Sequence, residues 1–323
     1  MHTRHLLIIA LAGGALVACS GDKHAGQGSN RAHPSHAVPA TDNASAEQVA
    51  AEARGDVHCP AAVPANPPGT PVSDIVGVRP GMTYEQAANA VMCSNPLLVV
   101  TAETGRGFQM HTYGQTIRQG FDARFAEPRV HKTGRQIVQE MEREATARGM
   151  NAVRQDMKPG QSKWFVSTMG MPGQERVIGA AREQWFAEAH NPTMDSVEQA
   201  LIAKYGTPTQ KMDHGSYRQL RWAYDPRGRL ITETSPLYNN CSGVADPDGG
   251  MNLSADCGVI VEAMIQSLRS NPALAQYLQA GVVDEAGGYR ALTDTQQGLQ
   301  AMDAARRARQ VQDASKNAQA PQL

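Results

Sequence analysis

The five cysteines offer the widest choice of chemistry in this chain, because a thiol can bind a metal, form a disulfide or carry a covalent group. The sequence has no CxxC motif and no Cys/His pair at a spacing typical of zinc sites, so we predict no metal site. An odd number of cysteines leaves at least one thiol outside any set of disulfides. The position of Cys19, directly after an apolar run, sets it apart from the other four.

Cys19 follows a short basic start and an almost unbroken apolar run from Leu6 to Val17, a pattern typical of a secretory signal peptide. The segment Leu16-Val-Ala-Cys19 resembles the lipobox of bacterial lipoproteins. That resemblance implies removal of a signal peptide over residues 1–18, acylation of Cys19 with palmitate-type chains, and sorting to the periplasmic face of the outer membrane because Ser20 follows the cysteine. The alternative is an ordinary signal peptide with an incidental cysteine.

The four remaining cysteines form an even set in an exported chain, which predicts disulfides because that compartment is oxidising. Four cysteines allow three pairings. We favour the two local pairings, Cys59–Cys93 and Cys241–Cys257. Each is expected to contribute about 2–4 kcal/mol by restricting the unfolded chain. Metal binding by these thiols is the competing interpretation.

No sequence pattern predicts a catalytic residue or a cofactor. The HExxH, GxSxG and P-loop motifs are absent, and His111, His131, His190 and His214 have no carboxylate or nucleophile at a suggestive spacing. The segment Asp246–Asn252 offers oxygens to Ca²⁺ but lacks the EF-hand spacing, so we favour a turn inside the Cys241–Cys257 loop. With 30 Lys+Arg against 31 Asp+Glu, nucleic acid is not an expected partner.

Composition and periodicity predict an α+β fold in two related modules behind a disordered N-terminal tether. Residues 19–70 contain few large apolar side chains, so we expect a lipidated, flexible tether there. A first module is expected over residues 71–188. It begins with a helix whose capping box is Thr83 and Gln86 and which stops near Ser94. The other elements expected in this module are strands at 97–101, 117–126 and 163–169 and an inserted helix at 134–148. The segment 176–186 fits either a strand or a helix, and we favour a strand because Gly179 would weaken a helix.

A second module is expected over residues 189–290. Asp195 and Glu198 repeat the capping box, and a shift of 112 residues superposes Met82 on Met194 and Thr83 on Asp195. Internal duplication is one explanation, and chance agreement of common capping signals is the other. The further elements expected here are strands at 217–224, 229–234, 257–268 and 281–284 and a short helix at 272–277; a C-terminal helix and frayed tail follow at 291–323.

The segment Ile75–Thr83 and the helix after it resemble the start of the SmpA/OmlA/BamE family of small outer-membrane lipoproteins. Gly77, Gly81, Met82 and Thr83 occupy the places of the family's Gly and Gly-Met-Thr motif, behind the candidate lipidated cysteine. The resemblance implies helices packed on one face of a small antiparallel sheet. The best-known member of the family is an accessory of the outer-membrane β-barrel assembly machine. Two modules in one chain are also similar to the β-lactamase inhibitor proteins.

Together these features predict a non-catalytic lipoprotein, anchored in the outer membrane on its periplasmic side. It is expected to bind one or more envelope protein partners or to help organise the envelope, with the membrane itself contacted through the lipid. One alternative is an inhibitor or sensor of an envelope enzyme, which predicts a broad aromatic sheet face. Another is an envelope hydrolase whose residues converge only in space.

Overall fold

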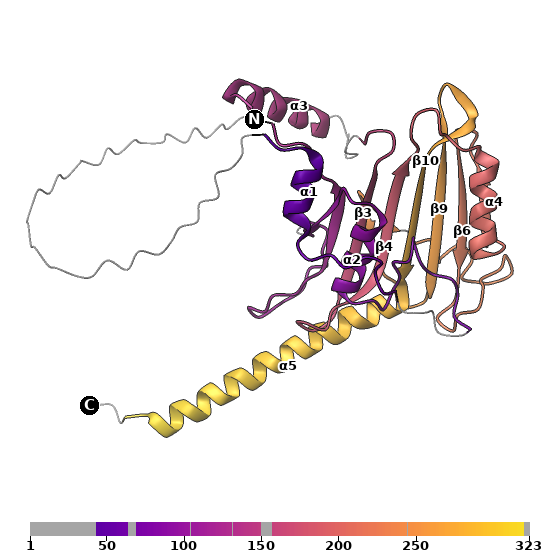
Figure 1. Ribbon diagram of the computed structural model, residues 1–323. Helices are drawn as coiled ribbons and strands as arrows, with labels where there is room; N and C mark the ends of the chain where they lie inside the picture. The colour runs from indigo at the N-terminus through magenta and orange to yellow at the C-terminus, as the bar shows by residue number, and fades with distance from the viewer. Residues whose placement is uncertain are drawn as a thin grey trace, which may run out of the picture. The chain divides into compact units, whose positions relative to one another are not determined.

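The fold is built on one antiparallel sheet, seen in the computed structural model within the described residues 43–63, 69–103, 105–130, 132–149, 157–243 and 245–319 (Figure 1). Its eight strands lie in the order β1-β2-β3-β4-β10-β9-β6-β5. They are β1 (Leu98–Ala102), β2 (Gly120–Phe125), β3 (Ser162–Met169), β4 (Arg176–Trp185), β5 (Gln210–Asp213), β6 (Tyr217–Ala223), β9 (Val259–Leu268) and β10 (Asn271–Asp284). A separate ribbon consists of β7 (Ala245–Asp246) and β8 (Gly250–Met251). The helices are α1 (Ala46–Arg54), α2 (Tyr84–Ser94), α3 (Gly134–Gly149), α4 (Met194–Tyr205) and α5 (Glu285–Asn317).

The sheet has two halves with mirrored strand order. Helix α2 is followed by β1 to β4 in the first half, and α4 is followed by β5, β6, β9 and β10 in the second. Strands β4 and β10 pair antiparallel, from Gly179 opposite Val283 to Trp185 opposite Tyr277. The expectation of two modules with separate small sheets, at 71–188 and 189–290, is therefore wrong, because this pairing satisfies two strand edges that separate sheets would leave open.

Each half begins with a capped helix. Thr83 accepts a hydrogen bond from Gln86 N–H in a complete capping box, which confirms the prediction for α2. In the second half the cap is Thr193, whose hydroxyl accepts from Ser196 N–H, so the predicted cap at Asp195 is wrong. Thr83 and Thr193 each form a single bridge with the last strand of their half, to Arg176 and Leu274 respectively. The shift that relates the two helix starts is thus 110 residues rather than 112.

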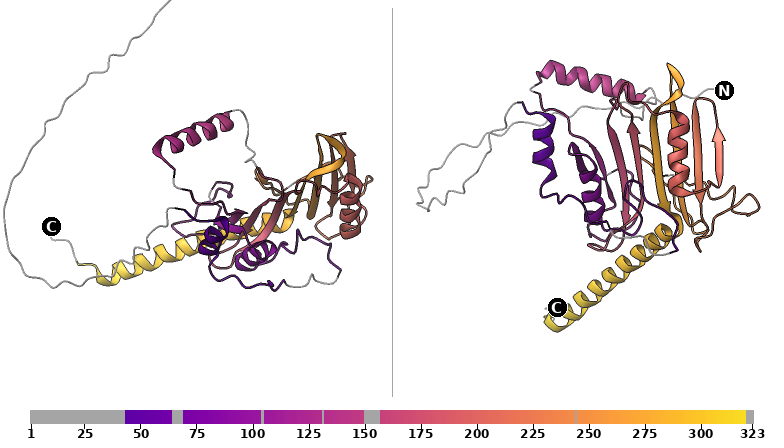
Figure 2. Two further views of the ribbon diagram at one scale, coloured as in Figure 1. Left: turned by 45° about the horizontal axis from the view of Figure 1, so that its top comes forward. Right: turned by 45° about the vertical axis from the view of Figure 1, so that its right-hand side comes forward.

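Helices α2 and α4 cover the same side of the sheet, which we call the helix face (Figure 2). The main apolar core lies between these helices and the strands. The strands contribute the buried side chains Phe121, Trp164, Val166, Val177, Leu220, Trp222, Val261 and Ile265. Burial on this scale is the main stabilising contribution of the fold, at about 25 cal/mol for each Å² of apolar surface removed from water.

The opposite side of the sheet, which we call the hairpin face, carries the β7–β8 ribbon. Gly179 and Gly281 lie beneath it, and a Cβ at Gly281 would meet the backbone oxygen of Ala245 at 2.2 Å. The two glycines therefore let the ribbon approach the sheet closely. The start of α5 also contacts strands β3, β4, β9 and β10. None of the helices in the described ranges combines the length and apolar composition needed to cross a bilayer.

Two predictions for the second half are wrong in their element type. The short helix expected at 272–277 and the strand at 281–284 form one long strand, β10, which pairs with β9 on one side and β4 on the other. The strand expected at 229–234 is reduced to a single bridge between Tyr224 and Leu230, and the edge strand β5 was not predicted. The inserted helix expected at 134–148 is confirmed as α3.

Residues 43–63 are more ordered than the tether predicted over 19–70. Helix α1 begins after a capping box formed by Ser45 and Gln48. Arg54 at its end donates to the backbone oxygens of Asn95 and Leu98 at 2.8 and 3.1 Å. Only Ala50 of this helix is buried, so caps and polar contacts hold it in place without an apolar stripe. The predicted signal peptide at 1–18 and the lipidation residue Cys19 lie outside the described residues.

Candidate functional site

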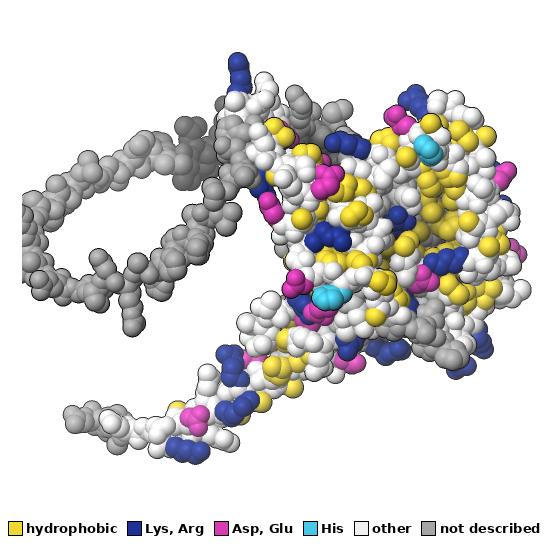
Figure 3. Space-filling view, in the orientation of Figure 1, with side chains coloured by type: hydrophobic (Ala, Val, Ile, Leu, Met, Phe, Trp, Pro, Cys, Tyr) yellow, Lys and Arg dark blue, Asp and Glu magenta, His cyan; other side chains and the backbone are white. Residues whose placement is uncertain are grey.

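A groove on the helix face is the strongest candidate for a functional site. It is a cavity of about 390 Å³ between α4 and the turn at residues 75–78, with β4 and β10 as its floor. Apolar side chains gather on this side of the molecule over the sheet (Figure 3). The apolar lining of the groove consists of Ile75, Val76, Phe186, Pro192, Val197, Ala200, Leu201, Leu278 and Ala280. A concave apolar site of this kind is typical of ligand binding.

Arg182 lies in the floor of the groove, and none of the described residues forms an ion pair with it. It stands on β4, opposite Trp164 of β3 and Ala280 of β10. Its Nε is buried and has no hydrogen-bond partner, and no ion pair to its guanidinium is formed within the described residues. Burial lowers the pKa of Arg182 to about 10. The guanidinium carbon lies 5.5 Å from the centre of the Trp164 ring, within the range of a cation–π contact.

The other polar side chains of the groove are engaged with the protein. Lys204 Nζ donates to Asp74 Oδ2 at 2.8 Å, and Tyr205 Oη donates to the backbone oxygen of Asp74, also at 2.8 Å. Ser196 Oγ donates to the backbone oxygen of Thr193 at 2.9 Å. Burial, together with the charge of Asp74, raises the pKa of Tyr205 well above its usual value, so its hydroxyl stays protonated. Among the described polar lining groups, Arg182 is thus the one left to bind something else.

The turn that forms the other wall contains a strained residue. Ile75 and Val78 exchange both backbone hydrogen bonds, at 2.8 and 2.9 Å, around Val76 and Gly77. Both central residues have positive φ, 47° at Val76 and 83° at Gly77. Glycine adopts this conformation freely, whereas a β-branched residue is strained there. Val76 is nevertheless 49% exposed at the rim of the groove, so an apolar side chain is displayed at a position where the backbone disfavours it.

We predict that Val76→Asn stabilises the protein by about 1 kcal/mol, because asparagine tolerates positive φ and Asn-Gly is the preferred pair for such a turn. Urea unfolding measures the change. Val72→Asn is the matched control, since Val72 is also exposed, at 38%, and is not among the residues with positive φ. Equal effects of the two substitutions would show that Val76 is not strained.

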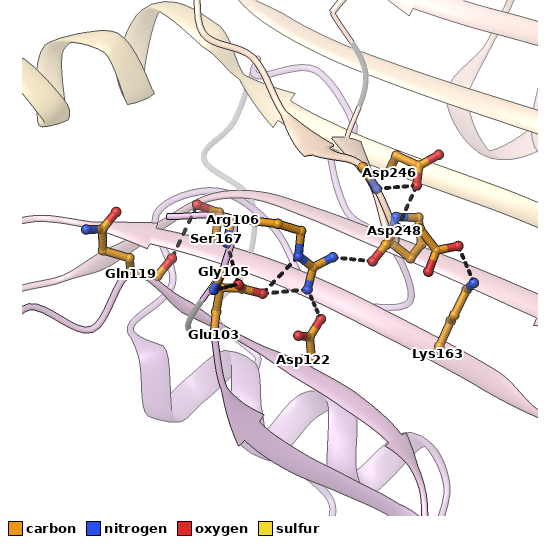
Figure 4. A network of polar contacts seen from close by, with 11 residues as sticks. Glu103, Gly105, Arg106, Gln119, Asp122, Lys163, Ser167, Asp246 and Asp248 are labelled. Atoms are coloured by element: carbon orange, nitrogen blue, oxygen red, sulfur yellow. Dashed lines mark hydrogen bonds and ion pairs between the residues drawn. The ribbon is translucent and has the colours of Figure 1, made fainter. Parts of the chain in front are cut away.

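A second polar cluster, on the hairpin face, has its charges paired (Figure 4). Arg106 joins Glu103, Asp122 and the backbone oxygen of Pro247. Burial alone would raise the pKa of Glu103, but the Gly105 N–H and the Arg106 guanidinium outweigh it and lower the pKa to about 2. Lys163, on β3, bonds Asp248 in the turn between β7 and β8. The cluster therefore fastens the ribbon and the loop after β1 onto the sheet.

The candidate Ca²⁺ segment belongs to this cluster. Asp246 Oδ1 accepts from the N–H groups of Asp248 and Gly249 at 2.7 and 2.8 Å, as in an Asx turn. Its other oxygen accepts from Gln279 Nε2. Within the described ranges, no group of three or more His, Cys, Asp or Glu side chains could hold a metal ion. The preferred interpretation of 246–252 as a turn is confirmed by these bonds.

The residues singled out from the sequence contribute to disulfides, turns, the core and a helix cap. The structure contains both favoured disulfides, Cys59–Cys93 and Cys241–Cys257. Gly77 and Gly81 have φ of 83° and 89°, Met82 is 1% exposed in the core, and Thr83 caps α2. These four motif residues shape the entry to α2, but none of them lines the groove. Arg182 and Val76 were missed; the one signal for Arg182 was a charge directly after the buried apolar run of 177–181.

Comparisons of the chain with protein-family models, with curated proteins and with solved structures found no match. The likeness of Ile75–Thr83 to the SmpA/OmlA/BamE motif therefore stays a prediction from the sequence.

Proposed function

We propose that this chain is a non-catalytic binding protein of the bacterial envelope, anchored by Cys19 in the outer membrane and facing the periplasm. The groove is the observation that supports the binding role, because it combines an apolar lining with the guanidinium of Arg182, which has no ion-pair partner among the described residues. Its described lining has no histidine, cysteine or carboxylate side chain, and the hydroxyl of its serine, Ser196, donates to the backbone oxygen of Thr193. These residue types favour retention of a ligand over hydrolysis.

A dye-binding experiment tests this function. The probe is N-phenyl-1-naphthylamine, a neutral apolar dye that fluoresces in apolar surroundings. We expect the wild-type protein to bind it, and Ala200→Trp to weaken binding about tenfold or more because the indole fills the groove. Gln199→Trp is the matched control, since Gln199 is exposed on the same helix and is not part of the lining. If Ala200→Trp bound the dye as tightly as the wild-type protein, the proposed site would be wrong.

The anchoring part of the proposal rests on Cys19 and predicts a change of location. Cys19→Ser is expected to release the protein from the membrane fraction, because no acyl chain can then be attached. Ser20→Asp serves as the comparison, and the lipobox resemblance implies that it keeps the anchor but retains the protein at the inner membrane. Fractionation of cells that produce the full chain measures both. Unchanged outer-membrane recovery of Cys19→Ser would contradict lipidation.

A protein partner is a second candidate function, favoured by aromatic stacks on the hairpin face. The rings of Trp185 and Tyr277 stack at 5.5 Å, and those of His214 and Tyr217 at 4.4 Å. Gln266 on β9 pairs in register with both Tyr277 and Tyr217, so the two stacks lie in one row across the sheet. Tyr277 is only 5% exposed, so the accessible part of the row consists of Trp185, His214 and Tyr217. These aromatic side chains fit an envelope protein partner, including an enzyme that this chain inhibits or senses.

Photo-crosslinking in cells tests the partner surface. A photoreactive amino acid at Gln219, on the hairpin face beside the aromatic row, is expected to give a discrete protein adduct. The same amino acid at Gln199, on the other side of the sheet, is the control and is expected to give none. Adducts of equal yield at both positions, or none at Gln219, would count against this surface.

A further inference from the structure

We infer that the groove binds a single-chain amphiphile with an anionic headgroup, of which a long-chain fatty acid is the simplest example, and that Arg182 binds the headgroup. This inference rests on the proposed binding function and names the class of ligand. Three observations lead to it: the unpaired guanidinium, the chemistry of the walls, and the position of the floor within the sheet.

The first observation, the guanidinium of Arg182 without an ion-pair partner among the described residues, indicates an anionic ligand group. Arg182 is half-buried and its Nε is withdrawn from water, and a charge taken partly out of water is costly unless it is paired and hydrogen-bonded. Arg182 has five N–H donors in a planar fork that matches a carboxylate or a phosphate. Within the described residues, its side chain has a ring contact with Trp164 but neither a hydrogen bond nor an ion pair. An anionic group of a ligand would satisfy the donors that the protein leaves open.

The second observation, the apolar walls of the groove, indicates that the rest of the ligand is an apolar chain. Val76 and Ile75 face Val197 and Leu201 across the groove, above Leu278 in the floor. Lys204 lines the same site, but its ammonium is held by Asp74. The volume of about 390 Å³ lies near the lower end of the range for small-ligand sites, ~300–1,000 Å³. The size therefore suits one chain better than two.

The floor argues against a peptide with a free C-terminus, the other common anionic ligand with apolar side chains. Proteins bind extended peptides by pairing their backbone at a sheet edge or in a nest of N–H groups. Strands β4 and β10 lie in the middle of the sheet, and each is paired on both sides. A peptide laid over them would bury N–H and C=O groups without partners, whereas an acyl chain has no such groups to satisfy.

Competition with the neutral dye tests the inference. Palmitate and hexadecanol, both below the concentration at which they aggregate, have the same chain and differ in headgroup charge. We expect palmitate to displace N-phenyl-1-naphthylamine at a concentration about tenfold to a hundredfold lower than hexadecanol, as charge-assisted hydrogen bonds to Arg182 imply. Arg182→Met is expected to remove that difference while keeping hexadecanol binding. Lys132→Met, which removes an exposed cation that is paired with Glu140 outside the groove, is expected to preserve it.

The outcomes separate this inference from the proposed function. Equal displacement by the acid and the alcohol in the wild-type protein overturns the role of Arg182 but leaves an apolar site. Failure of the dye itself to bind overturns both. Stronger displacement by a short apolar peptide with a free carboxylate than by palmitate overturns the choice of an acyl chain. The acid–alcohol comparison in the wild-type protein needs no variant, so the inference stays testable even if Arg182→Met does not fold.

Discussion

Replacing Trp222 by alanine is expected to lower the free energy of unfolding by about 3–5 kcal/mol, the usual cost of removing a buried aromatic side chain. Trp222 is fully buried in the core between β6 and α4. Its ring lies 5.0 Å from that of Tyr205, and its Nε1–H donates to the backbone oxygen of Gly206 at 2.8 Å. The substitution therefore leaves a cavity and also releases the end of α4 from the sheet. Urea unfolding with an unchanged m-value measures the loss.

A second tryptophan provides the control for the hydrogen bond. Trp164 is also buried in this core, but its Nε1 has no hydrogen-bond partner. Trp222→Phe and Trp164→Phe remove the same atoms of the indole, but only Trp222→Phe removes a hydrogen bond. We expect Trp222→Phe to cost about 1–3 kcal/mol more than Trp164→Phe. Equal costs would show that the bond to Gly206 contributes nothing measurable.

The other large effect is expected at Lys163, where methionine should lower the free energy of unfolding by about 3–5 kcal/mol. Lys163 and Glu183 are 2% and 1% exposed, and the Nζ of one lies 3.7 Å from the Oε2 of the other. Methionine fills a similar volume, so little packing is lost. The cost comes from the carboxylates of Glu183 and Asp248, which lose the cation between them. Thermal or urea unfolding at neutral pH measures it.

A double-mutant cycle separates this electrostatic cost from any loss of packing. Glu183→Gln removes the charge but keeps an oxygen for the Nε1–H of Trp185, which donates to Glu183 at 2.7 Å. The double variant with Lys163→Met is expected to recover about 2 kcal/mol relative to the sum of the single effects. Strict additivity would mean that the two side chains are not coupled.

Local signals in the sequence predicted the parts of the fold that local interactions form. The Thr83–Gln86 capping box and the stop after Ser94 were read correctly, because a cap depends on residues three apart. The start of α4 was misplaced by two residues, since Thr193 and Asp195 are both good caps and the structure uses the first. Strand β3 follows from its alternating pattern, β4 was favoured over a helix because of Gly179, and both disulfide pairings followed from sequence proximity.

Long-range pairing accounts for the parts that were missed. The segment 272–277 begins with the exposed residue Pro272, and its sequence resembles the start of a helix. It nevertheless belongs to strand β10, because β10 pairs with β9 on one side and with β4 on the other. The groove depends on the same pairing, because its floor exists only where β4 meets β10. A lone arginine in a strand gives no sequence signal of what surrounds it, so Arg182 could not be assigned to a site before the fold was known.

The junction of β4 with β10 also has a consequence for the order in which the protein folds. Gly179 and Val283, which face each other there, are 104 residues apart in the chain. During synthesis the chain of the first half is completed early, with β4 as an open edge that can pair wrongly. Its correct partner, β10, is synthesised only after nearly all of the other strands. Closing a loop of that length is slow. We therefore expect the sheet of the first half to be completed only after the last strand has been synthesised.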